Sequence, residues 1–149
     1  MDKYIYDDIE TYVINHITDY DFRLKYRGYT IEPITKYLPE RKRISFSRDN
    51  HILLQVSVAF NGFLNISFYN SDQGSTIFFF RMYLEKYDID AYEEFNKCDE
   101  LIRKHEDFYS RVKTQLEFFL RYLKQSQDLQ AVLNEEKWFD IPIDFGGMK

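Results

Sequence analysis

Cysteine, glycine and proline are scarce in this 149-residue chain, which holds one, five and three of them. Its lone cysteine, Cys98, cannot form an intramolecular disulfide, so a reducing compartment is expected. Neither a G-x-G-x-x-G nor a P-loop pattern is present to bind a dinucleotide or a nucleoside triphosphate. The sequence therefore predicts no cofactor.

Long apolar runs are also missing. No stretch approaches the roughly 18 apolar residues of a membrane-spanning helix. The first residues, MDKYIYDDIETY, carry acids where a secretory signal would have a basic segment and an apolar run. We expect a cytoplasmic protein with no membrane partner. Without repeats, low-complexity tracts or a composition break, residues 1–149 are expected to form a single α+β domain.

Catalytic and metal-binding patterns are lacking as well. His16, His51 and His105 have no cysteine or second histidine at ligand spacing, which argues against a metal site. There is no G-x-S-x-G, and Cys98 lies on an apolar helix face where a thiol is expected to be inert. The prediction is that the protein is not an enzyme.

Three carboxylate patterns resemble catalytic ones but have simpler explanations. Asp88-Ile89-Asp90 falls at the start of a helix, where acids cap the exposed N–H groups. Asp140 and Asp144 lie in an alternating tail that is expected to be solvated. Glu135-Glu136-Lys137 resembles a nuclease E-x-K, but it falls on a predicted helix rather than a strand.

The strongest structural pattern is an amphipathic helix over residues 88–124, begun by a capping pair, Asp90 and Glu93. No glycine or proline lies between Ser75 and Ile141, so the helix could reach ~50 Å. The polar run 104–107 leaves open whether the helix is continuous or bends or splits near His105. Its apolar seam follows heptad-like spacing through Ala91, Phe95, Cys98, Ile102, His105, Tyr109, Val112, Leu116, Phe119 and Leu123.

The remainder predicts a sheet and two further helices. A helix is expected over 3–20 and a shorter one from Ser126 to about Lys137. Gly28 is expected to end or bend the first strand, and 33–43 to form a loop with a basic end. Alternating apolar residues predict strands over 22–27, 44–46, 52–60, 63–70 and 76–85. The fold class is thus an antiparallel β-meander of four to five strands, packed on one face by the N-terminal helix and the long C-terminal helix.

Asn61-Gly62 is the best hairpin signal. A two-residue loop would place the apolar residues of the two strands on opposite faces. A three-residue loop of Phe60, Asn61 and Gly62, with Gly62 in the left-handed conformation, keeps them on one face. It predicts pairs of Val58 with Leu64, Val56 with Ile66 and Leu54 with Phe68.

The segment from Arg23 to Arg48 is basic, with eight basic residues against two acidic ones in a chain of net charge −5. It predicts a module that binds nucleic acid or another anionic ligand. The structural alternative is a charged edge strand, or pairing with the acids of the first helix. The candidate ligand-binding residues are Arg23, Lys25, Arg27, Arg41, Lys42 and Arg43.

The acidic remainder supports the leading hypothesis, which is a non-catalytic protein-interaction domain. Its most concrete form is an inhibitor or immunity-type protein that blocks a partner with a basic, nucleic-acid-handling surface. The candidate partner-binding residues are Asp88, Asp90, Glu93 and Glu94. The 91–123 seam could also support a homodimer, although packing within one chain is slightly favoured.

Overall fold

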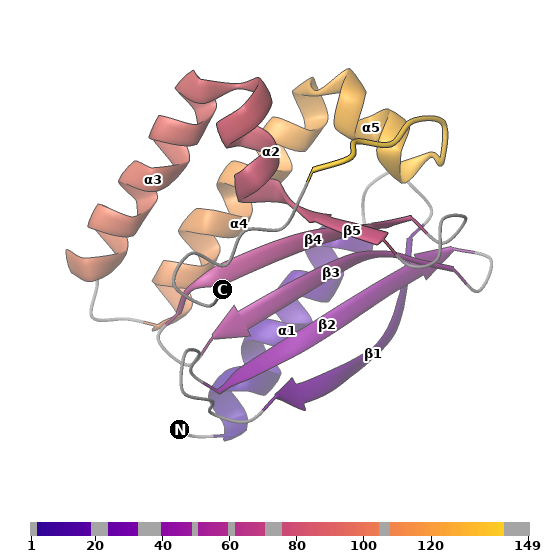
Figure 1. Ribbon diagram of the computed structural model, residues 1–149. Helices are drawn as coiled ribbons and strands as arrows, with labels where there is room; N and C mark the ends of the chain where they lie inside the picture. Colours follow the sequence, from indigo (N-terminus) through magenta and orange to yellow (C-terminus); the bar gives the residue numbers. More distant parts are fainter. Residues whose placement is uncertain are drawn as a thin grey trace.

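The structure is a computed structural model that describes residues 3–18, 24–32, 40–48, 51–59, 62–70, 76–104 and 108–141. Figure 1 shows a twisted sheet accompanied by helices. The helices are α1 (Lys3–Thr18), α2 (Phe80–Tyr87), α3 (Ile89–Lys104), α4 (Phe108–Gln125) and α5 (Gln127–Leu133). The strands are β1 (Lys25–Glu32), β2 (Arg41–Arg48), β3 (His51–Ala59), β4 (Leu64–Asn70) and β5 (Thr76–Phe79).

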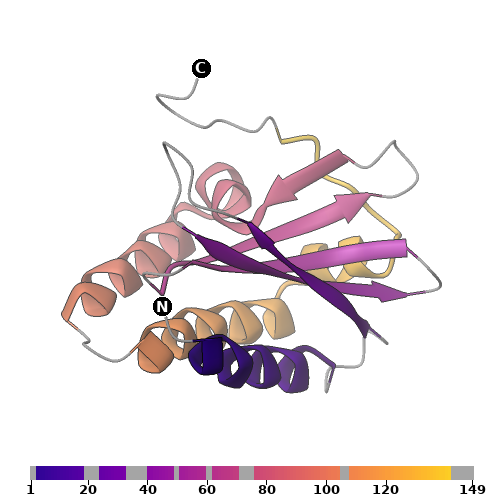
Figure 2. The same cartoon turned by 90° about the horizontal axis from the view of Figure 1, so that it is seen from below.

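The five described strands form one sheet in chain order, and every neighbouring pair is antiparallel. Figure 2 shows α1 and α4 side by side beneath one face of this sheet. Tyr12 of α1 meets Tyr109 of α4 at 5.3 Å between ring centroids, and Phe68 of β4 lies 6.1 Å from Phe119 of α4. The predicted α+β meander, covered by an N-terminal and a C-terminal helix, is confirmed.

The β3–β4 hairpin has the predicted register. Val58 pairs with Leu64, Val56 with Ile66 and Leu54 with Phe68. Gly62 has a φ of 88°, as the predicted loop requires, and its N–H donates to the Ala59 carbonyl at 2.9 Å. Phe60 and Asn61, the other two loop residues, lie outside the described residues.

The β1–β2 pair resolves the alternative left open at Gly28 and corrects the expected start of β2. Gly28, with a φ of 142°, sits at a bulge through which β1 continues, so it bends the strand rather than ending it. The expected loop up to Arg43 is wrong, because β2 already begins at Arg41. Lys42 takes a buried position in the same alternation as Ile44. A lysine at a core-facing position hid the strand pattern.

The strand expected over 76–85 is correct only to Phe79, after which the chain turns into α2. Phe80, Tyr83 and Leu84 are the buried residues of α2, at i, i+3 and i+4. The Phe80 ring contacts Phe119 at 4.9 Å between centroids. Alternating apolar residues 78, 80, 82 and 84 fit a strand equally well, and the packing of Phe80 and Tyr83 decides for the helix.

The long helix is split, which settles the alternative left open near His105. Figure 1 shows α3 and α4 running alongside each other, and Phe95 stacks on Phe118 with centroids 5.0 Å apart. In one continuous helix those residues would be about 35 Å apart. Residues 105–107, including His105, lie outside the described residues. The seam therefore folds back on itself as a helical hairpin.

The last helix, α5, begins as predicted. Ser126 is its N-cap, and the Ser126 hydroxyl accepts a hydrogen bond from the Leu129 N–H at 3.2 Å. The helix ends at Leu133 rather than near Lys137, because Glu135 adopts a left-handed φ of 62°. The chain there closes with a bond from the Glu136 N–H to the Ala131 carbonyl.

The core between sheet and helices is rich in phenylalanine, and one of the buried polar residues ties its layers together. Gln115 of α4 is fully buried. Its Oε1 accepts from the Leu64 N–H at 2.9 Å, and its Nε2 donates to the carbonyls of Gly62 and Arg111 at 2.7 and 2.9 Å. This side chain ties α4 to the β3–β4 hairpin. Among the described residues, no helix is long and apolar enough to cross a membrane.

Candidate functional site

The candidate site is organised around the junction of α2 and α3, where the chain turns at Asp88. The Asp88 N–H donates to the Leu84 carbonyl at 2.8 Å, which closes α2. Its Oδ1 accepts from the Ala91 N–H at 3.3 Å, which caps α3. The capping carboxylate is therefore that of Asp88, two positions before the predicted Asp90. A single residue ends one helix and begins the next.

The other predicted acids follow on α3. Asp90, Glu93 and Glu94 are all exposed, and their spacing places them on one helix face. Beside them, Tyr87 and Ile89 are 47% and 53% exposed. We call this surface the acidic corner, and it consists of Tyr87, Asp88, Ile89, Asp90, Glu93 and Glu94.

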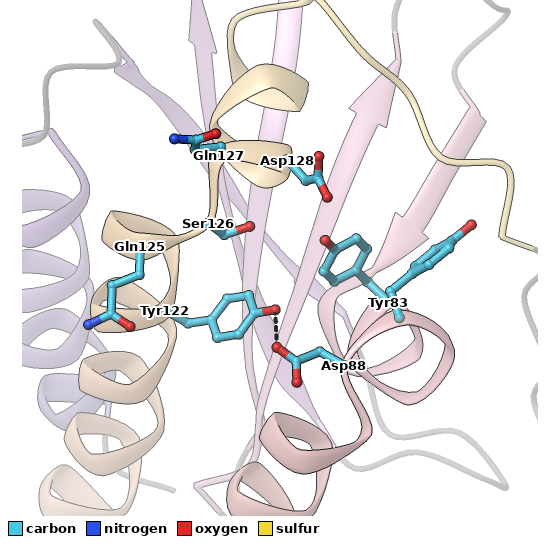
Figure 3. A pocket seen from close by; sticks show the side chains of 8 residues that line it. Tyr83, Asp88, Tyr122, Gln125, Ser126, Gln127 and Asp128 are labelled. Carbon is cyan, nitrogen blue, oxygen red and sulfur yellow. Dashed lines mark hydrogen bonds between the residues drawn. The ribbon is translucent and has the colours of Figure 1, made fainter.

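A pocket of about 610 Å³ opens next to the acidic corner. In Figure 3, Asp88 and Tyr122 point toward each other, and the Tyr122 hydroxyl donates to Asp88 Oδ2 at 2.8 Å. Asp128 of α5 faces the same space from the opposite side. We call this space the tyrosine pocket, and its lining residues are Tyr83, Tyr87, Asp88, Tyr122, Gln125, Ser126, Gln127 and Asp128.

The tyrosine pocket has a negative electrostatic character. Burial and the hydrogen bond to Asp88 raise the pKa of Tyr122 well above its ordinary value. Burial, followed by the charge of Asp128, raises the pKa of Tyr83, and a hydrogen bond with Ser126 acts in the opposite direction. Both phenols therefore stay neutral at physiological pH. No lysine, arginine or histidine is among the described residues that line the pocket.

Two lysines of the chain contact lining residues at the rim of the pocket. Lys137 Nζ lies 2.8 Å from Asp128 Oδ1, and both side chains are about half exposed. Lys86 Nζ lies 5.4 Å from the centroid of the Tyr87 ring. These contacts show that both an aromatic face and a carboxylate of the pocket are open to cationic groups.

The basic candidates behave differently, beginning with Lys42. The Lys42 side chain is only 3% exposed, and its Nζ pairs with Glu10 Oε2 of α1 at 2.7 Å. The same Nζ lies 3.9 Å from the centroid of the Tyr29 ring. Lys42 is thus held within the fold, as the alternative of pairing with the first helix anticipated.

Arg48 is also engaged within the chain. Its guanidinium donates to the Leu133 carbonyl and lies 3.6 Å from Glu135 Oε2. Arg48, the last residue of β2, thereby binds a backbone carbonyl and a carboxylate at the C-terminal end of α5.

The remaining basic residues do not form one patch. Lys25 pairs with Ser47 at one end of the β1–β2 ladder, whereas Arg41 pairs with Glu32 at the other end. Six strand residues separate these ends, about 20 Å. The antiparallel hairpin places the start of β1 opposite the end of β2, so Lys25 and Arg41 lie far apart. Arg23 lies outside the described residues, and Arg27 falls at the β1 bulge.

Histidine and metal chemistry have no support in the described ranges. His16 Nδ1 lies 2.9 Å from the Tyr12 carbonyl one helical turn earlier, and its ring packs on Tyr12 at 4.1 Å. Burial, then Glu117, raises the pKa of Tyr12 to about 12. No group of three histidine, cysteine or acidic side chains is found together in the part of the chain that the structure describes. Asp144 lies outside that part.

Sequence reasoning missed the tyrosine pocket. Tyr83 was assigned to a strand, and Tyr122 to the far end of a single helix. Only the turn at Asp88 and the α3–α4 hairpin bring residues 83–88 beside residues 122–128. The signals available for this site were the acids at the start of the helix, including Asp88, and the cap at Ser126.

No protein-family model, curated protein or solved structure matches the chain. The function must therefore be argued from the site itself.

Proposed function

We propose that the protein is a cytoplasmic, non-catalytic binding protein of the inhibitor or immunity type, which docks a partner with a basic surface on the acidic corner. The supporting observation is that exposed apolar side chains and carboxylates occur together there. Tyr87 and Ile89 are half exposed, and Asp90, Glu93 and Glu94 are exposed beside them on α3.

This combination suits protein recognition more than mere solvation. Apolar side chains at the centre of an interface supply affinity when they are desolvated. Surrounding carboxylates speed and orient the approach of a basic partner. Residues 85–100 carry seven acidic residues against two lysines, so the potential around the acidic corner is strongly negative.

A second candidate is the nucleic-acid or anionic-ligand module on β1. It is favoured by the exposure of Lys25, Tyr26 and Tyr29, since tyrosine rings can stack on bases. Against it, Lys42 is buried on Glu10, and Arg48 is bound to the end of α5. Less positive charge is then available for phosphate contacts than the sequence implied.

The two candidates are separated by charge reversal combined with affinity capture. Tagged protein is used to capture partners from its native cells, with and without nuclease. The test variant carries Asp90→Lys, Glu93→Lys and Glu94→Lys. Asp88 is left intact because it caps α3. The control reverses two exposed acids outside the acidic corner, Glu117 and Glu136.

We expect to capture a basic protein in stoichiometric amount, and its capture should survive nuclease treatment. The control variant should still bind this partner. The test variant should bind it with an affinity at least tenfold lower. A partner bound equally by both variants would contradict the proposed surface. Nucleic acid that is released by salt and lost in Lys25→Glu would favour the module on β1 instead.

A further inference from the structure

We infer that the tyrosine pocket is the site where an arginine side chain of the protein partner inserts. This inference rests on the proposed function, because it names the group of the partner that enters. The pocket shares Tyr87 and Asp88 with the acidic corner, so a partner seated on that corner also covers the mouth of the pocket.

The lining offers the two surfaces that a guanidinium binds. Tyr83, Tyr87 and Tyr122 present aromatic rings, and a guanidinium stacks on such faces. Asp88, in the turn between α2 and α3, and Asp128 of α5 present carboxylates toward the same space (Figure 3). A volume of about 610 Å³ is ample for one arginine side chain and accompanying water.

The lining residues offer hydrogen-bond acceptors, which match the donors of an arginine side chain. An arginine carries five N–H donors and no acceptor. Asp88 Oδ2 already accepts from Tyr122, and each carboxylate oxygen can accept more than one bond. Ser126 and the glutamine amides add further oxygen acceptors. In the part of the chain that the structure describes, no lining residue carries a positive charge that would repel the incoming group.

The contact of Lys137 with Asp128 indicates how an arginine of the partner reaches this carboxylate. Lys137 Nζ contacts Asp128 Oδ1 at 2.8 Å, but this pair is half exposed, and exposed ion pairs contribute little. An arginine arriving on the partner's surface can replace Lys137 on Asp128, because its planar fork can bind a carboxylate through two parallel bonds. Lys137 Nζ also lies 4.9 Å from the centroid of the Phe139 ring, so it keeps an aromatic contact when an arginine takes its place on Asp128.

The test is an NMR titration of the uniformly ¹⁵N-labelled full chain. The probe is N-acetyl-L-arginine amide, and the control ligand is N-acetyl-L-citrulline amide, which has nearly the same shape without the charge. We expect the arginine derivative to shift the backbone amide resonances of Tyr87, Asp88, Ser126 and Asp128. These shifts should saturate at a ligand concentration at least tenfold lower than with the citrulline derivative. Equal binding of the two ligands, or shifts elsewhere, would overturn the inference.

Variants make the assignment specific. Asp128→Asn should weaken the arginine derivative about fivefold or more, whereas Glu117→Gln, which removes the same charge from an exposed site on α4, should leave it unchanged. Urea unfolding of both variants checks that each is folded. Unchanged binding in Asp128→Asn would contradict a role for this pocket.

The captured partner separates this inference from the proposed function. If the partner is lost on charge reversal of α3 but binds Asp128→Asn and the unmodified protein equally, the acidic corner is correct and the pocket is not its arginine site. If the arginine derivative binds and no basic protein is captured, the proposed function fails, and the pocket belongs to a small cationic ligand rather than a partner.

Discussion

Gln115 is the residue through which the helical layer and the hairpin are joined. It is fully buried, and all three of its hydrogen bonds are made to backbone groups of Leu64, Gly62 and Arg111. If the Gln115 side chain is removed, its buried backbone partners are left without hydrogen bonds. The free-energy cost of leaving them unsatisfied exceeds the net contribution of the bonds themselves. Gln115 is therefore a point of specificity as well as stability.

Replacing Gln115 with methionine keeps the volume but removes every one of these bonds. We expect Gln115→Met to lower the free energy of unfolding by about 2–4 kcal/mol. Gln125→Met, on the exposed end of the same helix, should change it by less than about 0.5 kcal/mol. Urea unfolding monitored by circular dichroism measures both, and similar values for the two variants would show that Gln115 is not a structural tie.

Tyr122 should make the stability of the protein depend on alkaline pH. Its folded pKa is raised by burial and by the bond to Asp88. The stabilisation is complete below the unfolded pKa of about 10 and is lost as the pH rises toward the folded pKa. There the unfolded chain releases a proton that the folded chain keeps, so folding is opposed by up to about 1.4 kcal/mol per pH unit.

The measurement compares the wild-type protein with Tyr122→Phe between pH 8 and 11. At pH 8 we expect the variant to be less stable by about 1 kcal/mol, since the bond to Asp88 is lost. The difference should shrink above pH 10. Tyr109→Phe, at an exposed position, serves as control and should run parallel to wild type. A gap that stays constant to pH 11 would contradict the role of Tyr122.

Among the elements, α5 depends on a short cap. The Ser126 hydroxyl accepts from the Leu129 N–H at 3.2 Å, and α5 has only seven residues to hold Leu129, Val132 and Leu133 in the core. We expect Ser126→Ala to lower the free energy of unfolding by about 1 kcal/mol and Ser126→Gly by only a few tenths. Thermal and urea unfolding of both variants would test this, and an equal loss for alanine and glycine would argue against capping.

How far the sequence predicted these elements depended on whether local pattern or distant packing decided them. The β3–β4 register followed from Leu54, Val56 and Val58 alone, because a slip of one residue would expose that face. The segment after Phe79 was ambiguous, because its apolar residues satisfy both periods. Phe80 became helical through contacts with Phe95 and Phe119, which lie far along the chain.

The same distinction applies to the candidate site. Asp90, Glu93 and Glu94 could be recognised as an exposed acidic face from composition and helix spacing. The tyrosine pocket could not, since Asp88 and Tyr122 are 34 positions apart and meet only after the helix splits. The sequence left two interpretations of Lys42 open, a ligand-binding residue or a partner of the first helix, and its contacts with Glu10 and the Tyr29 ring favour the second.

Over the whole molecule, the apolar seam of residues 91–123 is used inside the chain. Phe95, Leu116 and Phe119 are at most 2% exposed, and Phe119 touches both Phe68 of the sheet and Phe80 of α2. A homodimer built on this seam would need these side chains at the surface. The burial supports the preference for packing within one chain.

We therefore expect a monomer. Light scattering coupled to gel filtration should give 18.2 kDa at both micromolar and submillimolar concentrations. Phe119→Ala should lower the free energy of unfolding by about 3–5 kcal/mol through the cavity it leaves, with no change in the mass of the folded fraction. Tyr109→Ala, at a partly exposed seam position whose ring contacts Tyr12, should cost less stability than Phe119→Ala and also leave the mass unchanged. A mass twice as large, reduced to that of the monomer in Tyr109→Ala while the variant stays folded, would place a dimer interface on the seam.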